Sequence, residues 1–502
     1  MRGTMLTGTL VVATVLIAGC FANPVKKYPQ PVPAPLHSTH PSARLFDDTI
    51  IVKYKETVLN LNDPDHRKAK MNDIAAGFSN VPGLSGLTAI RTMPILGIQN
   101  FKLGQSQSLN TVILLLRKHP SVQYAEYNFR VVASQPHPPK DPDDPQWSAA
   151  CEPTMPCSFW GLKKIGMRSA WGFQTDASSI TVAILDSGID YMHPDLESNM
   201  WTDPVTPDSH GYNFCSHTKY PLDIFGHGTQ VAGIIGARGN NNYGAVGADW
   251  QVKLLALKML CINGEKVPMG SLAIAEEAIE DAISRDVPII NNSWRVLPPV
   301  NHTDIQSLEF AVRRTNCESM NNIVANCKPA LFVASAGNGI YPESLNSDDS
   351  GCSDPLHPEN CGRVFPASYG AGPYNVANVI SVGATICPNP PGCAGPVSNT
   401  LWYNSHYGNT TVHIAAPGDD IDTTTLSQEG NGYTVFVGTS AAAAHVSGCA
   451  ALLQARNLSL KSTLLPIADI KKLLFDNAET PFMGFIIGGR SLNCAQAIAA
   501  IP

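Results

Sequence analysis

The stretch Ile180-Thr-Val-Ala-Ile-Leu-Asp-Ser-Gly-Ile-Asp190 joins a nearly continuous apolar run to a carboxylate. Apolar side chains at almost every position, rather than at alternate ones, are typical of a strand buried on both faces of a parallel sheet. Asp186 stands where this strand is expected to end. Because a buried carboxylate is costly unless it is satisfied, Asp186 is either a turn residue or a functional group.

The same apolar pattern recurs downstream and alternates with helical patterns. Expected strands cover residues 252–257, 288–293, 330–335 and 379–383, and expected helices cover 231–237, 271–284, 440–455 and 467–477. This alternation predicts an α/β fold of three layers, in which a doubly wound, mostly parallel sheet carries helices on both faces. In such folds, functional side chains gather beyond the carboxyl ends of the strands.

A different pattern precedes this domain. Expected strands at 49–55, 98–103 and 122–127 and a helix at 109–119 predict a small α+β unit over residues 48–133. The Pro-rich stretches 23–47 and 134–146 predict linkers, of which the second is a site exposed to cleavage. Residues 147–502 then form the α/β domain.

The N-terminus and the cysteines both predict export. Residues 1–22 hold an apolar run too short to span a bilayer and predict a secretory signal peptide. The sequence Ile17-Ala-Gly-Cys20 leaves open the alternative of a lipid anchor on Cys20. Without Cys20, 12 of the 13 cysteines remain, an even number with no C-x-x-C pair. This pattern favours disulfides over a zinc site.

The remaining composition limits the partners. The formal net charge is −7 and the sequence has no basic stripe, which argues against a nucleic-acid partner. Glycosylation is expected at surface sequons, which are headed by Asn291, Asn301, Asn409 and Asn457. Asn291 falls within an expected buried strand and is therefore not expected to be reachable.

A serine opens the stretch Gly438-Thr-Ser-Ala-Ala-Ala-Ala-His-Val-Ser-Gly448. The alanine run predicts a helix, because alanine is the best helix former. Ser440 would then lie at a helix N-terminus, where backbone N–H groups can stabilise a developing oxyanion. The alternative is that Ser440 only caps the helix.

Three further residues make the nucleophile hypothesis stronger. His227, between two glycines, precedes an expected helix, and Asp186 and Asn338 each follow an expected strand. Acyl transfer by a serine needs a base and a carboxylate that orients the base, which His227 and Asp186 would provide for Ser440. Asn338 could donate a hydrogen bond to the oxyanion.

Four blocks of this chain resemble the signature blocks of the subtilisin-like (subtilase) serine endopeptidases. They are Asp186–Leu196, Gly226–Gly233, Ala336–Asn338 and Gly438–Ser440. The resemblance implies a catalytic triad of Asp186, His227 and Ser440 and an oxyanion hole that includes Asn338. It also implies a set of substrate-binding residues, namely Ser293, Trp294, Ala336 and Gly337.

The resemblance extends to the N-terminal unit and to a metal. Residues 48–133 are similar to the family's inhibitory propeptide, a ferredoxin-like α+β unit. Asp195 and Asn241 match side-chain ligands of a structural Ca²⁺ site in the family, whereas catalysis would need no cofactor. The alternative is that residues 240–244 form an ordinary turn.

The function implied is a secreted, monomeric serine endopeptidase that cleaves proteins or peptides through an acyl-enzyme. It would be made as a self-processing zymogen whose own propeptide inhibits it. One alternative is an inactive homologue that serves as a binding module, and another is a disulfide-rich structural protein. Ala441, Ala444 and Arg295 depart from the family's usual Met, Pro and Gly, so Arg295 leaves the subsite preferences open.

Overall fold

A computed structural model describes residues 46–59, 63–105, 107–133, 147, 158–262, 268–296, 305–317, 328–339, 363–387 and 400–501. The predicted signal peptide, the first linker up to residue 45, the processing linker and the sequon at Asn301 lie outside the described residues. Within the described part, no helix combines the length and apolar character that crossing a membrane requires.

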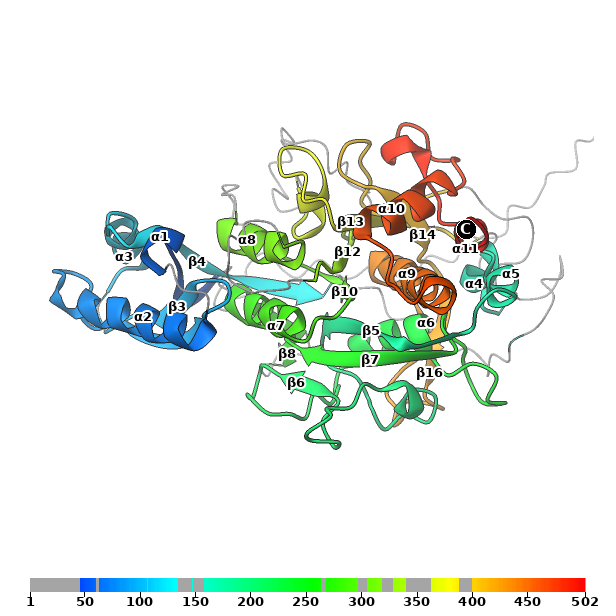
Figure 1. Cartoon of the computed structure of the whole chain (residues 1–502), viewed down its shortest axis with the longest axis horizontal. Coiled ribbons are helices and arrows are strands. Elements are labelled where there is room, and N and C mark those ends of the chain that lie inside the picture. The colour runs from blue at the N-terminus through cyan, green and yellow to red at the C-terminus, as the bar shows by residue number, and fades with distance from the viewer. Residues whose placement is uncertain are drawn as a thin grey trace, which may run out of the picture. The chain divides into compact units, whose positions relative to one another are not determined.

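The N-terminal unit is a four-stranded antiparallel sheet with helices packed on it (Figure 1). Its elements are β1 (Phe46–Tyr54), α1 (Glu56–Leu59), α2 (Pro64–Gly77), β2 (Thr88–Met93), β3 (Ile98–Lys102), α3 (Leu109–Arg117) and β4 (Val122–Ala133). The strand order β2-β3-β1-β4 gives the βαββαβ arrangement of ferredoxin-like folds. The sequence did not predict β2 and α2. For α2 the reason is that it buries only Arg67 and Met71, so it leaves little apolar periodicity.

Seven strands form the parallel sheet of the larger domain, in the order β14-β13-β12-β10-β5-β7-β6. Their bounds are β5 (Asp176–Asp186), β6 (Gly211–Asn213), β7 (Gln251–Lys258), β10 (Ile289–Asn292), β12 (Leu331–Ser335), β13 (Val379–Thr385) and β14 (Ile414–Pro417). Every neighbouring pair is parallel. The predicted doubly wound sheet is therefore confirmed.

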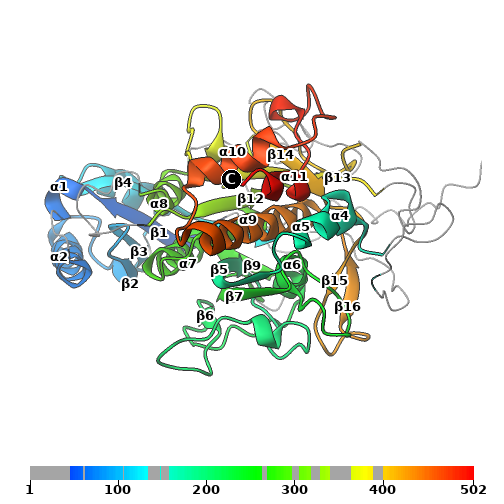
Figure 2. The same cartoon turned by 45° about the vertical axis from the view of Figure 1, so that its right-hand side comes forward.

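Helices cover both faces of this sheet (Figure 2). The helices of the larger domain are α4 (Trp160–Lys164), α5 (Met167–Trp171), α6 (His227–Gly236), α7 (Leu272–Ser284), α8 (Gln306–Thr315), α9 (Thr439–Lys461), α10 (Ile467–Asp476) and α11 (Cys494–Ala499). Alternate residues of β5 join different cores: Val182 and Ile184 pack with α6 and α9, whereas Ala183 and Leu185 pack with α7 and α8. This two-sided burial is the reason that the strand reads as a continuous apolar run.

The central helix is α9, whose alanines are fully buried. A helix that is buried all round must pack closely on its neighbours, and small side chains allow this approach. The disulfide between Cys449 and Cys494 joins α9 to α11, and a second disulfide joins Cys215 to Cys261. These two bridges close loops of 45 and 46 residues, so each joins distant parts of the chain.

Short strands connect the two units. The strands β8 (Cys261–Ile262), β9 (Pro268–Ser271) and β11 (Trp294–Val296) belong to the larger domain, but β9 and β11 both pair with the end of β4. A separate hairpin is formed by β15 (Ile421–Thr424) and β16 (Tyr433–Phe436). Figure 1 shows β4, in cyan, running from the N-terminal unit into the larger domain.

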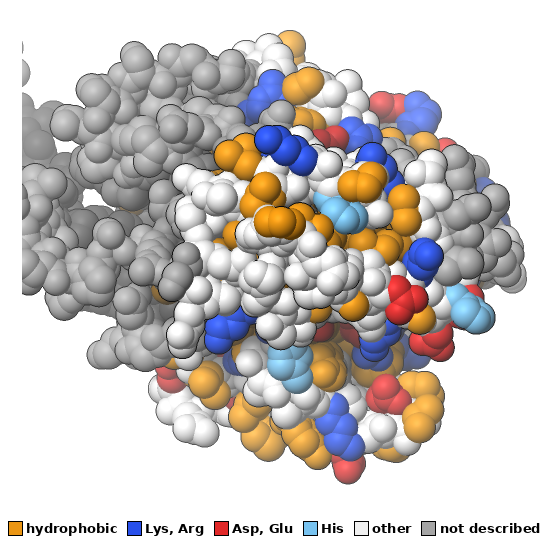
Figure 3. Space-filling view, turned by 90° about the vertical axis from the view of Figure 1, so that its left-hand side faces the viewer, with side chains coloured by type: hydrophobic (Ala, Val, Ile, Leu, Met, Phe, Trp, Pro, Cys, Tyr) orange, Lys and Arg blue, Asp and Glu red, His pale blue; other side chains and the backbone are white. Residues whose placement is uncertain are grey.

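Figure 3 shows one face of the molecule in space-filling form. On this face, Lys and Arg side chains are interspersed with acidic and apolar ones. Among the described sequons, Asn291 and Asn457 are buried and Asn409 is exposed. Only Asn409 of these three is accessible to glycosylation in the folded protein.

Candidate active site

Asp186 is the last residue of β5 and is fully buried. One of its carboxylate oxygens, Oδ1, accepts a hydrogen bond from the backbone N–H of Ser187 at 2.7 Å. The same oxygen lies 2.7 Å from Nδ1 of His227. The carboxylate is thus aimed at the imidazole from the carboxyl end of a buried strand, where such folds place their functional groups.

His227 is the first residue of α6, four residues earlier than the sequence predicted. The helix begins here because Gly226 adopts a φ of +106°, which glycine tolerates and other residues rarely do. A Cβ atom on Gly228 would lie 2.0 Å from the carbonyl oxygen of Gly188. Gly226 therefore sets where α6 begins, and Gly228 lets α6 approach the turn that follows Asp186.

Ser440 lies within α9, near its N-terminus, and its Oγ is 3.3 Å from Nε2 of His227. The N-cap position of α9 is held by Gly438, and no side chain caps this helix end. The helix-cap alternative for Ser440 is therefore wrong. The Oγ also donates to the carbonyl oxygen of Ser293 at 3.2 Å, and the ring of Phe436 packs edge-on against His227 with centroids 5.3 Å apart.

Asn338 lies beside this serine, and its amide has a fixed orientation. Its Oδ1 accepts from the backbone N–H and the hydroxyl of Thr439 at 2.9 and 2.7 Å. A Cβ atom on Gly438 would approach Nδ2 of Asn338 to 2.8 Å, and Gly438 has a φ of +136°. Thr439 therefore orients the amide, and Gly438 leaves room for its nitrogen.

Of the four predicted substrate-binding residues, Ser293 contacts Ser440 directly, Gly337 contacts the neighbouring Thr439, and Trp294 and Ala336 are buried. Ser293 exchanges hydrogen bonds with Ser440, since its Oγ donates to the Ser440 carbonyl at 3.2 Å. Gly337 has a φ of +105°, and its N–H donates to the Thr439 hydroxyl. The Trp294 side chain is fully buried in the core beneath β11, so only its backbone faces the strand β4.

The end of β4 lies between β9 and β11 as the middle strand of an antiparallel set. Val132 is paired with Met269 on one side and with Arg295 on the other. Ala133 is paired with Trp294, directly before Arg295. An extended backbone segment is thus held at the edge of the site by two strands of the larger domain.

The predicted calcium ligands Asp195 and Asn241 lie together. The amide Nδ2 of Asn241 donates to Asp195 Oδ1 at 2.6 Å, while Oδ2 accepts from the Ala245 N–H and the Tyr433 hydroxyl. The Asn241 Oδ1 accepts from the Tyr243 N–H. Ca²⁺ needs oxygen ligands, so this arrangement does not fit the ion unless the Asn241 amide turns over. Burial raises the pKa of Asp195.

Sequence reasoning missed several residues that complete the site. Thr439 orients Asn338, Phe436 packs on His227, and Lys258 contacts the backbone next to Asp186. Thr439 could have been found as the neighbour of the nucleophile. The sequence signal for Lys258 is weaker, because it is only a single lysine at the end of an apolar strand.

Known proteins resemble this chain over most of the larger domain. A model of the subtilase family matches residues 177–490. A thermophilic serine proteinase of Bacillus sp. (strain AK1) is 27% identical over 437 residues, which cover 86% of this chain and 85% of the relative. Subtilisin-like protease 1 of Plasmodium falciparum (isolate 3D7) is 30% identical over 311 residues, 58% of this chain and 40% of the relative.

A second Plasmodium falciparum relative, subtilisin-like protease 2, is 33% identical over 303 residues, 59% of this chain and 19% of the relative. This chain therefore spans less than half the length of either Plasmodium protein. The family match confirms the predicted enzyme class, a serine endopeptidase of the subtilisin type. Because the match covers more than half of its length, this chain belongs to the subtilase family.

Proposed function

We propose that the chain cleaves peptide bonds through Asp186, His227 and Ser440. The observation that carries this proposal is the continuous line of contacts from Asp186 Oδ1 to His227 Nδ1 at 2.7 Å and from His227 Nε2 to Ser440 Oγ at 3.3 Å. Nucleophile, base and orienting carboxylate need such contacts for acyl transfer.

In this mechanism Ser440 Oγ attacks the scissile carbonyl carbon while His227 takes its proton. The protonated His227 then gives a proton to the leaving amine, which yields an acyl-enzyme that water hydrolyses. Asp186 holds His227 in the productive orientation and stabilises its positive charge. The Asn338 amide and the backbone N–H of Ser440 donate to the oxyanion.

The substrate is an extended polypeptide that adds a strand between β9 and β11. The support for this is the end of β4, which pairs with both strands. Main-chain hydrogen bonds of this kind bind many sequences, and side-chain pockets then select among them. By the same contacts the N-terminal unit would act as an inhibitory propeptide until the chain cuts itself within 134–146.

Secretion of the protein is a further part of the proposal. The disulfides Cys215–Cys261 and Cys449–Cys494 support this, because structural disulfides persist in oxidising compartments.

Calcium binding remains a prediction. If calcium binds, added Ca²⁺ should raise the thermal unfolding midpoint, and Asp195→Ala should remove that rise.

The test is Ser440→Ala. A fluorophosphonate should label the processed wild-type protein and not this variant, and the variant should retain its N-terminal unit when produced in a protease-free host. Ser459→Ala, which removes an exposed serine on the same helix, is the matched control and should behave as the wild type. Normal processing of Ser440→Ala would contradict self-maturation.

The same labelling separates the alternative of an inactive binding module. In that case the wild-type protein would not react with the fluorophosphonate after removal of its N-terminal unit. The contact between His227 and Ser440 argues against this alternative, since it retains a base within reach of the nucleophile.

A further inference from the structure

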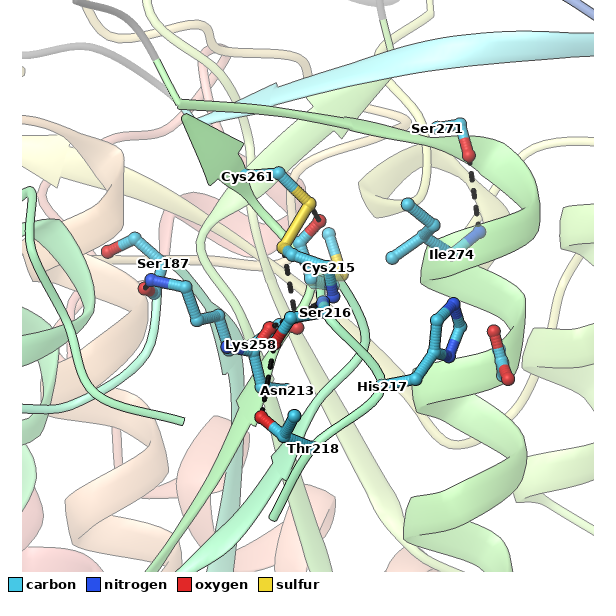
Figure 4. The surroundings of a disulfide bond; sticks show 12 residues. Ser187, Asn213, Cys215, Ser216, His217, Thr218, Lys258, Cys261, Ser271 and Ile274 are labelled. Atoms are coloured by element: carbon cyan, nitrogen blue, oxygen red, sulfur yellow. Dashed lines mark hydrogen bonds between the residues drawn. A yellow bond between two sulfur atoms is a disulfide. The ribbon is translucent and has the colours of Figure 1, made fainter. Parts of the chain in front are cut away.

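Lys258, the last residue of β7, is a buried cation next to the proposed triad. Its Nζ donates to the carbonyl oxygen of Ser187 at 2.6 Å and to that of Leu222 at 2.9 Å. Figure 4 shows the Lys258 side chain extended toward Ser187. A charged group is rarely buried without compensation, so these contacts call for a role.

The two carbonyl groups belong to the segments that carry two members of the triad. Ser187 directly follows Asp186, and Leu222 lies in the segment that leads to His227. Backbone hydrogen bonds between Ile189 and residues 221 and 223 run beside these contacts. Lys258 therefore joins the Asp186 segment to the His227 segment through one ammonium group.

The carboxylates that interact with this ammonium also belong to the proposed catalytic site. The carboxylates that act on Lys258 are Asp223 and Asp186, whose attraction opposes the lowering of the Lys258 pKa by burial. Asp223 accepts from the N–H and the hydroxyl of Thr229 at 3.0 and 2.7 Å, so it holds the first turn of α6. The second oxygen of Asp186, Oδ2, has no hydrogen-bond donor among the described residues.

The backbone of Lys258 is itself held firmly. Its carbonyl oxygen accepts from the Phe214 N–H at 2.9 Å, and the next two residues donate from their N–H groups to the Asp186 carbonyl. The two cysteines of the Cys215–Cys261 disulfide directly follow Phe214 and Leu260, so this bridge lies close to the anchor (Figure 4). The side chain thus extends from a point that is paired with β5 on one side and with β6 on the other.

We propose that Lys258 is a positioning residue of the catalytic site. Its two hydrogen bonds hold Asp186 and His227 in register, and its ammonium balances the charge of Asp186. This inference rests on the proposed function. It adds a residue outside the four signature blocks, and one that acts through Asp186 rather than on the substrate.

Two consequences follow from the geometry and the charges. Loss of the hydrogen bonds lets the two segments shift, and a displacement of about 1 Å in a catalytic group can cost about 100-fold in rate. His227 contacts Asp186 of β5, Ser440 of α9 and Phe436 of β16. The Lys258 ammonium interacts electrostatically with Asp223 and Asp186. Without the positive charge of Lys258, the protonated form of the His227 imidazole is favoured. His227 should therefore become protonated at a higher pH.

The experiment compares Lys258→Gln with Lys258→Arg in the full chain after processing. The glutamine variant should lose about 10–100-fold in kcat with KM nearly unchanged, and the acidic limb of its kcat/KM profile should move up by about 0.5–1 pH unit. The arginine variant keeps the charge and should keep the acidic limb. Lys253→Gln, at an exposed position of the same strand, is the matched control and should match the wild type.

A second readout does not depend on activity. In the Ser440→Ala chain, the pH midpoint of His227 protonation is followed by NMR with and without Lys258→Gln, and it should rise in the double variant. An unchanged midpoint, or a glutamine variant with wild-type kcat, overturns the proposal. Should Lys258→Gln not fold, Lys258→Met, which keeps the aliphatic stem, carries the same expectation.

The two proposals fail differently. If the wild-type protein is inactive and unlabelled by fluorophosphonate, the proposed function fails, and the NMR comparison still decides the role of Lys258. If the wild-type protein is active but Lys258→Gln loses only thermal stability, with its pH profile unmoved, Lys258 is a structural residue alone.

Discussion

At the scale of single residues, the site depends on a few backbone and side-chain orientations. Asn338 is the clearest case, because Thr439 holds its Oδ1 from two donors and thereby orients the amide nitrogen. Gly438 leaves the space that this nitrogen needs. Thr439 and Gly438 therefore set the orientation of the Asn338 amide beside Ser440.

Replacing Asn338 by leucine should reduce kcat by about 10²–10³-fold, because one oxyanion donor is lost. KM should change little, since the interaction forms mainly in the transition state. Steady-state kinetics on a peptide substrate measure this. Thr439→Val should show a smaller loss, because the backbone N–H still holds Asn338; a loss equal to that of Asn338→Leu would contradict the orienting role.

At the scale of elements, the close approach of helices to their neighbours sets the position of Ser440. Gly448 on α9 faces the loop after α6, and a Cβ atom there would lie 2.6 Å from the Cβ of Ala248. Neither atom can rotate away, so α9 or the loop must move. Because α9 carries Ser440 and α6 carries His227, their packing positions both residues.

Gly448→Ala should therefore lower the free energy of unfolding by about 1–3 kcal/mol, the usual cost of overpacking. Thermal unfolding of the Ser440→Ala chain, which cannot digest itself, measures the effect. Gly77→Ala in α2 is the control, because a Cβ there meets nothing within 4 Å. That change should be neutral or stabilise the N-terminal unit by about 0.5–1 kcal/mol; equal destabilisation by both changes would contradict the packing argument.

At the scale of the whole molecule, buried carboxyl groups lie where β4 and the 94–97 turn meet α7 and α8. Glu126 of β4 accepts from the backbone N–H groups of Gln306 and Ser307, and Glu280 of α7 accepts from the N–H of Ile95. Burial raises the pKa of both to about 8. Burial, with Glu126 nearby, also raises the pKa of Glu276 on α7.

The sign of the pH dependence follows from these shifts. These carboxyl groups bind protons more tightly when the N-terminal unit is docked than when they are exposed to solvent. The contact between the two units is therefore strongest at a pH below the ordinary pKa range of a carboxyl group. It weakens as the pH rises toward about 8. Burial lowers the pKa of Lys53 to about 8. Loss of the Lys53 proton therefore strengthens the contact only above that pH.

After the proposed cleavage within 134–146, the N-terminal unit should therefore separate from the larger domain more readily at pH 8 than at pH 5.5. Size-exclusion chromatography of the cleaved protein at both pH values measures the fraction that stays bound. Glu276→Gln cannot ionise and should reduce the difference. Stronger retention at pH 8 than at pH 5.5 would overturn this prediction.

The sequence predicted the parallel sheet and the identity of the proposed triad because both leave local signals. A strand buried on two faces is apolar throughout, as in 180–185, and a helix that starts with tight packing shows glycine and alanine. The start of α6 was placed late because the positive φ of Gly226 has no periodic signature. Trp294, a predicted substrate-binding residue, has its side chain in the core, so only its backbone on β11 can pair with an extended chain.

The amino-acid order by itself predicted the inner strands of the parallel sheet and the end of β5, and it led to the proposal that Asp186, His227 and Ser440 act together. The tertiary structure decided what these residues touch. The contacts of Lys258 with Leu222, of Glu126 with Ser307 and of Asn241 with Asp195 all join residues far apart in the chain. Local patterns record burial and turns, whereas such contacts arise only when distant segments pack against each other.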